Sequence, residues 1–191
     1  MTYSFCTICK GRLHTLEKVL FGNLAFAEKY PNFEFVLLNY DSPDGLDKWV
    51  KKKFYLSFER YHLRYGSFFA GPYLRLSHAK NLAHKLAFGD ILINLDADNM
   101  LTQSYIDELL NVFEGLEGNN SVLCSNYNSS ITGRIALPRE MFFALKGYDE
   151  AFLHYGYEDI DLIESNLVTK YGEMAKGVLK IVKSDFKLLN N

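Results

Sequence analysis

The sequence is poor in cysteine and has no excess of charge of either sign. Three cysteines among 191 residues cannot build a disulfide framework, so we expect a reducing, cytoplasmic setting. Lys and Arg total 21 against 23 Asp and Glu, for a formal net charge of −2. Because the chain has no basic field, we do not expect nucleic acid as its partner.

Long hydrophobic runs are also missing. No apolar segment approaches the roughly 20 residues that a membrane-spanning helix needs, and the apolar stretch within Met1–Arg12 is too short for a secretory signal. Over about residues 166–191, lysines interleave with apolar residues. We expect an amphipathic C-terminal element that covers the sheet. The alternative is a helix on a membrane surface, which leaves peripheral membrane contact open.

The sequence also lacks linkers, repeats and low-complexity tracts, which favours one domain over residues 1–191. Apolar periodicity and turn residues predict alternating strands and helices. The expected strands are Tyr3–Cys9, Glu34–Tyr40, His62–Tyr65, Asp90–Leu95, Val122–Ser125 and Ile131–Leu137. The expected helices are Thr15–Tyr30, Leu46–Phe54, Ser77–Phe88, a helix capped by Ser104 with Asp107 that runs through Val112, and Pro138–Leu145. This alternation predicts an α/β fold with a mostly parallel central sheet flanked by helices.

In such sheets, ligands lie beyond the carboxyl ends of the strands, and an acidic cluster follows one of them. The buried strand that ends at Leu95 runs directly into Asp96-Ala97-Asp98. One carboxylate can reach a ribose hydroxyl while the other binds a hard divalent cation that bridges a diphosphate. The alternative is an ordinary acidic turn, since Asp-x-Asp alone is a weak signal.

A second acidic cluster lies among aromatic residues and glycines. Gly147-Tyr148-Asp149-Glu150 is followed by His154-Tyr155-Gly156-Tyr157-Glu158-Asp159-Ile160-Asp161. Burial among aromatic rings raises the pKa of a carboxyl group and makes it a usable general base. Taken alone, the segment reads more simply as the charged first turn of a helix.

Together these segments resemble the GT-A glycosyltransferases. Leu95–Asp98 is similar to the Asp-x-Asp motif of family 2, and Gly147–Asp161 is similar to the Gly-Trp-Gly-Gly-Glu-Asp-Asp-Asp segment of the β-1,4-galactosyltransferases of family 7. Ile8–Arg12 and Ser77–Lys80 resemble the Pro-Phe-Arg-Asn-Arg and Asn-Arg-Ala-Lys segments of the same enzymes. Asn39–Gly45 resembles the acidic turn that holds uracil in family 2.

The resemblance implies a GT-A fold, Rossmann-like, with a nucleotide-binding half over about residues 1–100 and an acceptor and catalytic half over about 101–165. It implies an inverting transfer of a hexose from a nucleoside diphosphate sugar, UDP-linked, to a hydroxyl of a glycan or another acceptor. Asp98, with Asp96, would hold Mn²⁺ or Mg²⁺. Asp159 would be the general base, and Glu158 would orient hydroxyl groups.

Further roles follow from the same resemblance. The residues implied in binding the nucleotide sugar are Thr7, Lys10, Arg12, Asn39, Asp41, His78, Lys80 and Asp96. Of these, Lys10, Arg12 and Lys80 would neutralise the diphosphate, and His78 would lie near it. Those implied in binding the acceptor or sugar are Tyr155, Gly156, Tyr157 and Asp161. The family places a further histidine ligand after the Glu-Asp segment, and no histidine follows Asp161 here.

Two other functions fit parts of the pattern. A sugar nucleotidyltransferase would also have an acidic metal site, but it needs a glycine-rich loop after the first strand, and Cys9–Arg12 has one glycine. A nucleotide-sugar or carbohydrate-binding module without turnover is compatible with the missing histidine. The pair Cys6 and Cys9 has no second pair for zinc, so both are expected to be buried apolar residues.

Overall fold

A seven-stranded sheet forms the centre of the molecule, in strand order β3-β2-β1-β4-β7-β6-β8. The computed structural model describes residues 1–55, 58–115, 121–125, 133–152, 156–164, 180–184 and 189–190. The strands of this sheet are β1 (Tyr3–Cys9), β2 (Phe33–Asn39), β3 (Leu63–Ser67), β4 (Ile91–Asn94), β6 (Ser121–Ser125), β7 (Ala136–Pro138) and β8 (Lys180–Ser184). A two-stranded sheet pairs β5 (Asn99–Met100) with β9 (Leu189–Asn190).

The first four strands of the central sheet are parallel. β1 pairs with β2 over its whole length, from Tyr3 opposite Phe33 to Cys9 opposite Asn39, and with β4 on its other side. The expected parallel sheet is thus confirmed in this half, where apolar strands alternate with crossover helices. β7 runs antiparallel between β4 and β6, and β8 is parallel to β6.

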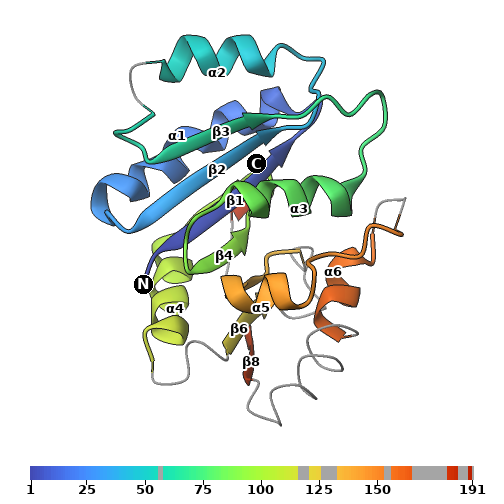
Figure 1. The fold of residues 1–191 in the computed structure, drawn as a ribbon. Helices are drawn as coiled ribbons and strands as arrows, with labels where there is room; N and C mark the ends of the chain where they lie inside the picture. Colours follow the sequence, from blue (N-terminus) through green and yellow to red (C-terminus); the bar gives the residue numbers. More distant parts are fainter. Residues whose placement is uncertain are drawn as a thin grey trace.

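Helices cover both faces of the sheet (Figure 1). They are α1 (Leu13–Lys29), α2 (Leu46–Phe54), α3 (Leu76–Leu86), α4 (Gln103–Phe113), α5 (Arg139–Ala144) and the short α6 (Glu158–Asp161). Side chains alternate across a strand, so β1 feeds two cores. Phe5 packs in one core with α1, α2 and α4, while Cys6 packs in the other with α3 and α5. Cys6 and Cys9 are buried free thiols, as expected.

Several boundaries differ from the expected ones. The cap of α4 is Thr102, whose hydroxyl accepts a hydrogen bond from the Tyr105 amide at 3.3 Å, so the predicted cap at Ser104 is wrong. β7 is shorter than the predicted strand, of which residues 131–132 lie outside the described part. Pro138 ends β7 and caps α5 rather than starting it.

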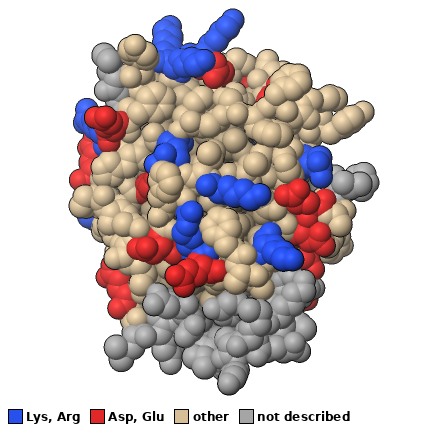
Figure 2. Space-filling view, viewed as in Figure 1, with Lys and Arg blue, Asp and Glu red and all other residues tan. Residues whose placement is uncertain are grey.

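The C-terminal segment also differs from the prediction where it is described. Residues 180–184 form β8 and extend the sheet beside β6, rather than covering a face. These residues form a strand because they pair with β6, which lies far away in the sequence. Such pairing is possible wherever an edge strand has unpaired backbone groups. Over the described residues, no helix has the length and hydrophobicity required to cross a bilayer. On the face drawn in Figure 2, acidic and basic side chains are mixed, so the electrostatics of a site must be judged locally.

Candidate active site

A cleft of about 440 Å³ lies beyond the carboxyl ends of the parallel strands. Residues of both predicted acidic clusters line it, although the clusters are far apart in the sequence: Asp96 and Asp98 come from the first, and Glu158 and Asp159 from the second. The lining side chains are Ile8, Lys10, Arg12, Leu74, Leu76, Lys80, Asp96, Ala97, Asp98, Gly133, Arg134, Glu158 and Asp159. Because β1 and β4 are parallel neighbours, the segments after them meet at one edge, as expected for a ligand site of an α/β sheet.

Asp96 and Asp98 form the first acidic group, directly after β4. The Asp98 carboxylate lies 3.3 Å from the Arg12 guanidinium and accepts a hydrogen bond from Asn99 Nδ2 at 2.8 Å. Asp96 Oδ2 lies 3.8 Å from Arg134. The two carboxylates are 34% and 39% exposed, so both remain open to a ligand in the cleft.

Glu158 and Asp159 form the second acidic group and close around one lysine. Lys80 Nζ donates to Glu158 Oε1 at 2.9 Å and to Asp159 Oδ1 at 2.6 Å. The side chains of Lys80 and Glu158 are 3% exposed and that of Asp159 is 16% exposed. Lys80 comes from α3 and the acidic pair from α6, which begins directly after Tyr157 in a left-handed conformation (φ 70°).

The environment shifts the pKa values of the two carboxyl groups of this pair in opposite directions. Burial, together with the negative charge of Glu158, raises the pKa of Asp159 to about 6, although the Lys80 ammonium acts in the opposite direction. Burial by itself also raises the pKa of Glu158, but attraction to Lys80 and hydrogen bonds outweigh it and lower that pKa below its ordinary value. Asp159 is therefore the group that can exchange a proton near neutral pH.

Gly133 and Arg134 complete the cleft, and neither was predicted. A Cβ at Gly133 would lie 2.7 Å from Asp159 Oδ2, so only glycine allows the carboxylate to approach this closely. Arg134 is 3% exposed and hydrogen-bonds Asn99 Oδ1 with its Nε. A Gly-Arg pair that leads into a buried strand is the sequence signal that would have drawn attention to them.

The residues predicted to hold the nucleotide sugar divide into two groups. Lys10 and Arg12 line the cleft, although Lys10 Nζ donates to the carbonyl oxygens of Tyr40, Asp41 and Gly71 at 2.7–3.2 Å. Arg12 is 57% exposed and is the more available cation. Lys80 also lines the cleft, with its ammonium directed at the acidic pair.

The remaining predicted nucleotide-side residues lie outside the lining of this cleft. Asn39 donates to the Tyr65 hydroxyl at 3.0 Å and accepts from the Ser42 amide at 2.8 Å. Asp41 accepts a hydrogen bond from the Gly71 amide at 2.9 Å. The other two are Thr7, which is 6% exposed within β1, and His78, whose Nδ1 lies 2.8 Å from the Tyr40 hydroxyl.

The predicted acceptor-side residues that the structure describes lie in α6 or directly before it. Gly156 has φ 107°, and the Tyr157 side chain is 75% exposed next to the acidic pair. The Asp161 amide donates to the Tyr157 carbonyl at 2.8 Å. Tyr155 lies outside the described residues.

A divalent cation bound in the cleft requires oxygen ligands from the protein. Over the described residues, no three His, Cys, Asp or Glu side chains converge on one point. Asp96 and Asp98 nevertheless offer two carboxylates at the mouth of the cleft. Mg²⁺ in proteins is often held by one or two carboxylates together with substrate phosphates and water, so these residues fit a cation that arrives with a diphosphate.

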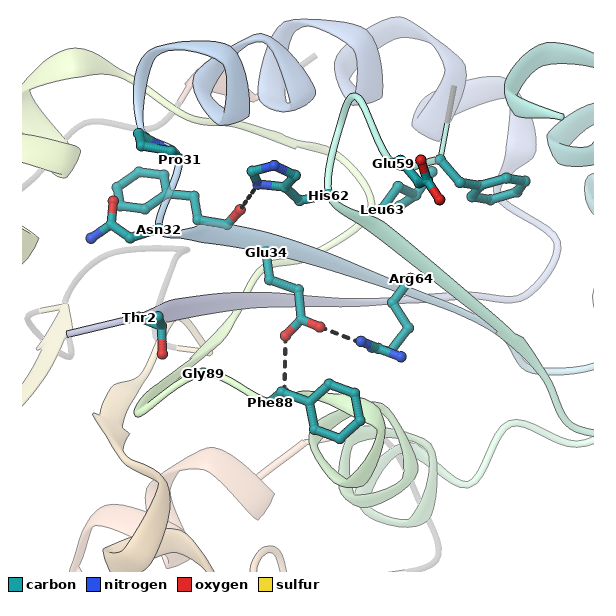
Figure 3. A pocket seen from close by; sticks show the side chains of 12 residues that line it. Thr2, Pro31, Asn32, Glu34, Glu59, His62, Leu63, Arg64, Phe88 and Gly89 are labelled. Atoms are coloured by element: carbon teal, nitrogen blue, oxygen red, sulfur yellow. Dashed lines mark hydrogen bonds and ion pairs between the residues drawn. The ribbon is translucent and has the colours of Figure 1, made fainter. Parts of the chain in front are cut away.

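A second hollow, of about 590 Å³, lies at the opposite edge of the sheet, around the amino ends of β1, β2 and β3 (Figure 3). Glu34 crosses it and is bonded to Arg64 Nε and to the Phe88 amide, at 2.8 and 2.9 Å. Its volume is larger than that of the cleft, but it contains none of the predicted site residues. Ligands of α/β sheets bind at the other edge.

An α/β sheet covered by helices on both faces, with a cleft beyond the carboxyl ends of its strands, defines the class of doubly wound α/β proteins, which bind their ligands at that place. Residues 4–175 match the model of glycosyl transferase family 2. The chain therefore belongs to that family. No curated protein matches it.

Solved structures with the same fold include one with GDP-Man bound and one with UDP bound. The mannosyltransferase PcManGT from Pyrobaculum calidifontis, in complex with GDP-Man and Mn²⁺, is 16% identical with a TM-score of 0.71, covering 95% of this chain and 54% of the other. S. aureus TarS 1–349 is 12% identical with a TM-score of 0.66, covering 98% and 59%. Its complex with UDP is 14% identical with a TM-score of 0.64 and the same coverage. The likeness shows the fold, which is GT-A, and this chain spans less than two thirds of those chains.

Proposed function

We propose that the chain transfers a hexose from a nucleoside diphosphate sugar to a hydroxyl group of a glycan or another acceptor, with inversion at the anomeric carbon. One observation carries the proposal: Asp96, Asp98, Glu158 and Asp159 line a single cleft. Membership of glycosyl transferase family 2 supports it, and so do fold relatives solved with UDP or with GDP-Man.

The donor diphosphate is assigned to the side of the cleft that holds Asp96, Asp98 and Arg12. Four basic and four acidic side chains line the cleft, so a diphosphate adds negative charge that the protein alone does not balance. Asp98, assisted by Asp96, would hold Mn²⁺ or Mg²⁺. When bound, the cation stabilises the charge that develops on the leaving diphosphate. Arg12, exposed at the mouth, supplies a further positive charge.

Asp159 acts as the base in this proposal. Its carboxylate takes the proton from the acceptor hydroxyl as that oxygen forms a bond to the anomeric carbon. The bond between the anomeric carbon and the diphosphate oxygen breaks, and its electron pair leaves with the diphosphate. A single displacement of this kind inverts the configuration. A pKa of about 6 leaves Asp159 largely ionised at neutral pH while keeping it basic enough to accept the proton.

Glu158 and Tyr157 are assigned to the acceptor side. Tyr157 is a non-glycine residue with φ 70° whose ring is 75% exposed immediately before the acidic pair. Strained backbone of this kind persists where the surrounding structure fixes it and is frequent at functional sites. We assign its ring to contact with the acceptor, and Glu158 to the orientation of substrate hydroxyls.

Release of nucleoside diphosphate tests the proposal directly. The purified chain is incubated with UDP-glucose, UDP-galactose, UDP-N-acetylglucosamine or GDP-mannose, with Mn²⁺ and with a panel of simple glycosides as acceptors. We expect acceptor-dependent release from at least one donor, and a product of inverted anomeric configuration by NMR. Donor binding without release from any combination would instead identify a binding module, and a retained anomer would exclude direct displacement.

A further inference from the structure

Lys80 and Glu158 are the least exposed charged side chains of the cleft, at 3% each, and the Lys80 ammonium has partners on three sides. Two N–H groups face the carboxylates of Glu158 and Asp159, and the nitrogen lies 5.0 Å from the centroid of the Tyr148 ring. A buried lysine loses its charge unless partners hold it. Here attraction to the two carboxylates outweighs burial, so the pKa of Lys80 is raised.

Glu158 and Asp159 depend in turn on the charge of Lys80. Glu158 and Asp159 are adjacent in the sequence and share one side of the cleft, where their side chains are 3% and 16% exposed. Two carboxylates this close and this buried do not both ionise unless a cation lies between them. Asp96 adds further negative charge nearby. Arg134, the other buried cation among the described residues that line the cleft, is directed at Asp96 and Asn99.

The position of Lys80 is fixed by the backbone around it. Its neighbour Asn81 donates through Nδ2 to the Tyr148 carbonyl and accepts through Oδ1 from the Tyr148 amide, both at 2.9 Å. These bonds join α3 to the segment that leads toward α6. Gly147 allows the approach, since a Cβ there would meet Asn81 Oδ1 at 2.4 Å and its φ is +73°. The ammonium is therefore presented to the acidic pair by a rigid support.

We propose that Lys80 is a positioning residue: its buried ammonium keeps Glu158 and Asp159 ionised together and holds Asp159 in place to accept the acceptor's proton. This rests on the proposed function in so far as Asp159 is the base. It differs from a role on the donor diphosphate, which would require Lys80 to leave two ion pairs. Arg12, at 57% exposure, is better placed for that role.

The charge role is tested first by stability, without any substrate. Lys80→Met keeps the length of the side chain and removes the charge, and Lys85→Met changes an exposed lysine of the same helix as the matched control. Thermal denaturation of the full chain is followed between pH 5 and pH 8. Lys80→Met should lower the melting temperature most at pH 8 and least at pH 5, because a carboxyl of the pair can take up a proton in place of the lost cation.

A rescue variant separates charge from packing. Adding Glu158→Gln and Asp159→Asn to Lys80→Met removes the unbalanced charge while keeping the shapes. We expect the triple variant to recover most of the stability at pH 8 and to lose the extra pH dependence. If Lys80→Met does not fold at pH 8, a folded triple variant supports the proposal. A triple variant as unstable as Lys80→Met, or an equal loss at every pH, would overturn it.

Catalysis gives the second readout. In the pH profile of kcat, the midpoint of the acidic limb should lie about one pH unit or more higher for Lys80→Met than for the unmodified protein, since Asp159 then binds its proton more tightly. The affinity for UDP with Mn²⁺, measured by calorimetry, should change by less than about threefold, and Lys80→Arg should restore most of kcat. An unmoved limb, combined with a loss of UDP affinity above about tenfold, would assign Lys80 to the diphosphate and overturn the inference.

These outcomes are distinguishable from failure of the proposed function. If Asp159→Asn retains full turnover, Asp159 is not the base, and the proposed mechanism fails. The stability series and its rescue still report whether Lys80 holds the pair ionised. Loss of the rescue together with an inactive Asp159→Asn enzyme would reject the inference and leave the proposed function intact.

Discussion

A hollow lies at each end of the strands of the central sheet, one at their amino ends (the amino edge) and one beyond their carboxyl ends (the carboxyl edge). The two hollows differ in how their charges are satisfied. At the amino edge, the Glu34 carboxylate receives hydrogen bonds from the Ser4 hydroxyl, the Phe88 amide and Arg64. Burial alone would raise the pKa of Glu34, but these bonds outweigh it and lower the pKa below its ordinary value. Such a carboxylate is fully engaged in holding the fold.

At the carboxyl edge, the charges are close together and incompletely satisfied. Asp159 has a pKa raised to about 6, and Glu158 Oε2 is buried without a hydrogen-bond partner among the described residues. This cleft has the smaller volume, about 440 Å³ against about 590 Å³. Unsatisfied charge, rather than volume, is therefore the property that distinguishes the candidate active site from the larger hollow at the amino edge.

Asp159→Asn, at the carboxyl edge, is expected to reduce turnover more than any other change. The change keeps the shape and removes the proton acceptor, so kcat should fall about 10²- to 10⁴-fold while UDP binding barely changes. In the unmodified enzyme, kcat/KM should rise with pH through about 6, because the base is active only when ionised. Steady-state rates from pH 5 to pH 8 give both results. Asp107→Asn, at an exposed site on α4, is the control, and near-normal turnover of Asp159→Asn would refute the assignment of the base.

The next effect concerns the other acidic group of the cleft. Asp98→Ala should weaken UDP binding in the presence of Mn²⁺ on the order of 10- to 100-fold, because the diphosphate and the carboxylates repel each other without a shared cation. Calorimetry with UDP, with and without EDTA, measures this. EDTA should reduce the affinity of the unmodified protein to that of the variant. Unchanged affinity in EDTA would show that the cation is not required.

At the amino edge, Glu34→Gln should affect stability and leave turnover unchanged. The variant presents an amide group to the donors that now bind the carboxylate, and we expect a loss of about 1–3 kcal/mol in the free energy of unfolding at pH 7. Because the folded-state pKa of Glu34 is lowered, its contribution is present above the unfolded value, near 4.5, and is lost as the pH falls below it. Urea denaturation at pH 7 and pH 3.5 tests this, and the difference between the two proteins should shrink at the lower pH. A fall in turnover would mean that this edge takes part in the reaction.

Much of the fold on which these comparisons rest could be predicted from local sequence. Tyr3–Cys9 and Leu46–Phe54 have the predicted bounds, because a buried apolar run and an amphipathic helix are both marked by their own periodicity. The cap of α4 was misplaced because Thr102 and Ser104 are both hydroxyl residues suited to it. Residues 180–184 could not be assigned to an edge strand, because their partner, β6, lies far away in the sequence.

The site shows the same limit more clearly. Asp96–Asp98 and Glu158-Asp159 could be found from their context, since an acidic cluster after a buried strand is a local pattern. The placement of Lys80 between two carboxylates of another helix could not be predicted. Its two ion pairs span sequence separations of 78 and 79 positions. Asn39 and Asp41 were predicted to bind the nucleotide, and the Asn39 side chain hydrogen-bonds within the fold, so its contact with a nucleotide stays a prediction. Sequence indicates which polar residues gather at an edge, and packing decides which are already satisfied.

The smallest effect is expected from the aromatic ring at the amino edge. The Phe88 ring is 67% exposed and lies 4.0 Å from the Arg64 guanidinium, whereas Tyr157 is 75% exposed beside the acidic pair at the other edge. Phe88→Ala removes an exposed cation–π contact, so stability should fall by about 0.5–1 kcal/mol and turnover should stay unchanged. Tyr157→Ala is the matched change, and it should raise the KM for the acceptor with little effect on the KM for the donor.

Melting temperatures and initial rates of these two variants, measured side by side with one donor and one acceptor, decide the comparison. If exposed aromatic area alone marked a binding surface, both changes would impair activity to a similar degree. If unsatisfied charge marks it, only the ring next to Glu158 and Asp159 matters to the rate, because its contacts with the acceptor position a hydroxyl against the base. Impaired turnover in Phe88→Ala, with normal kinetics in Tyr157→Ala, would reverse the assignment of the two edges.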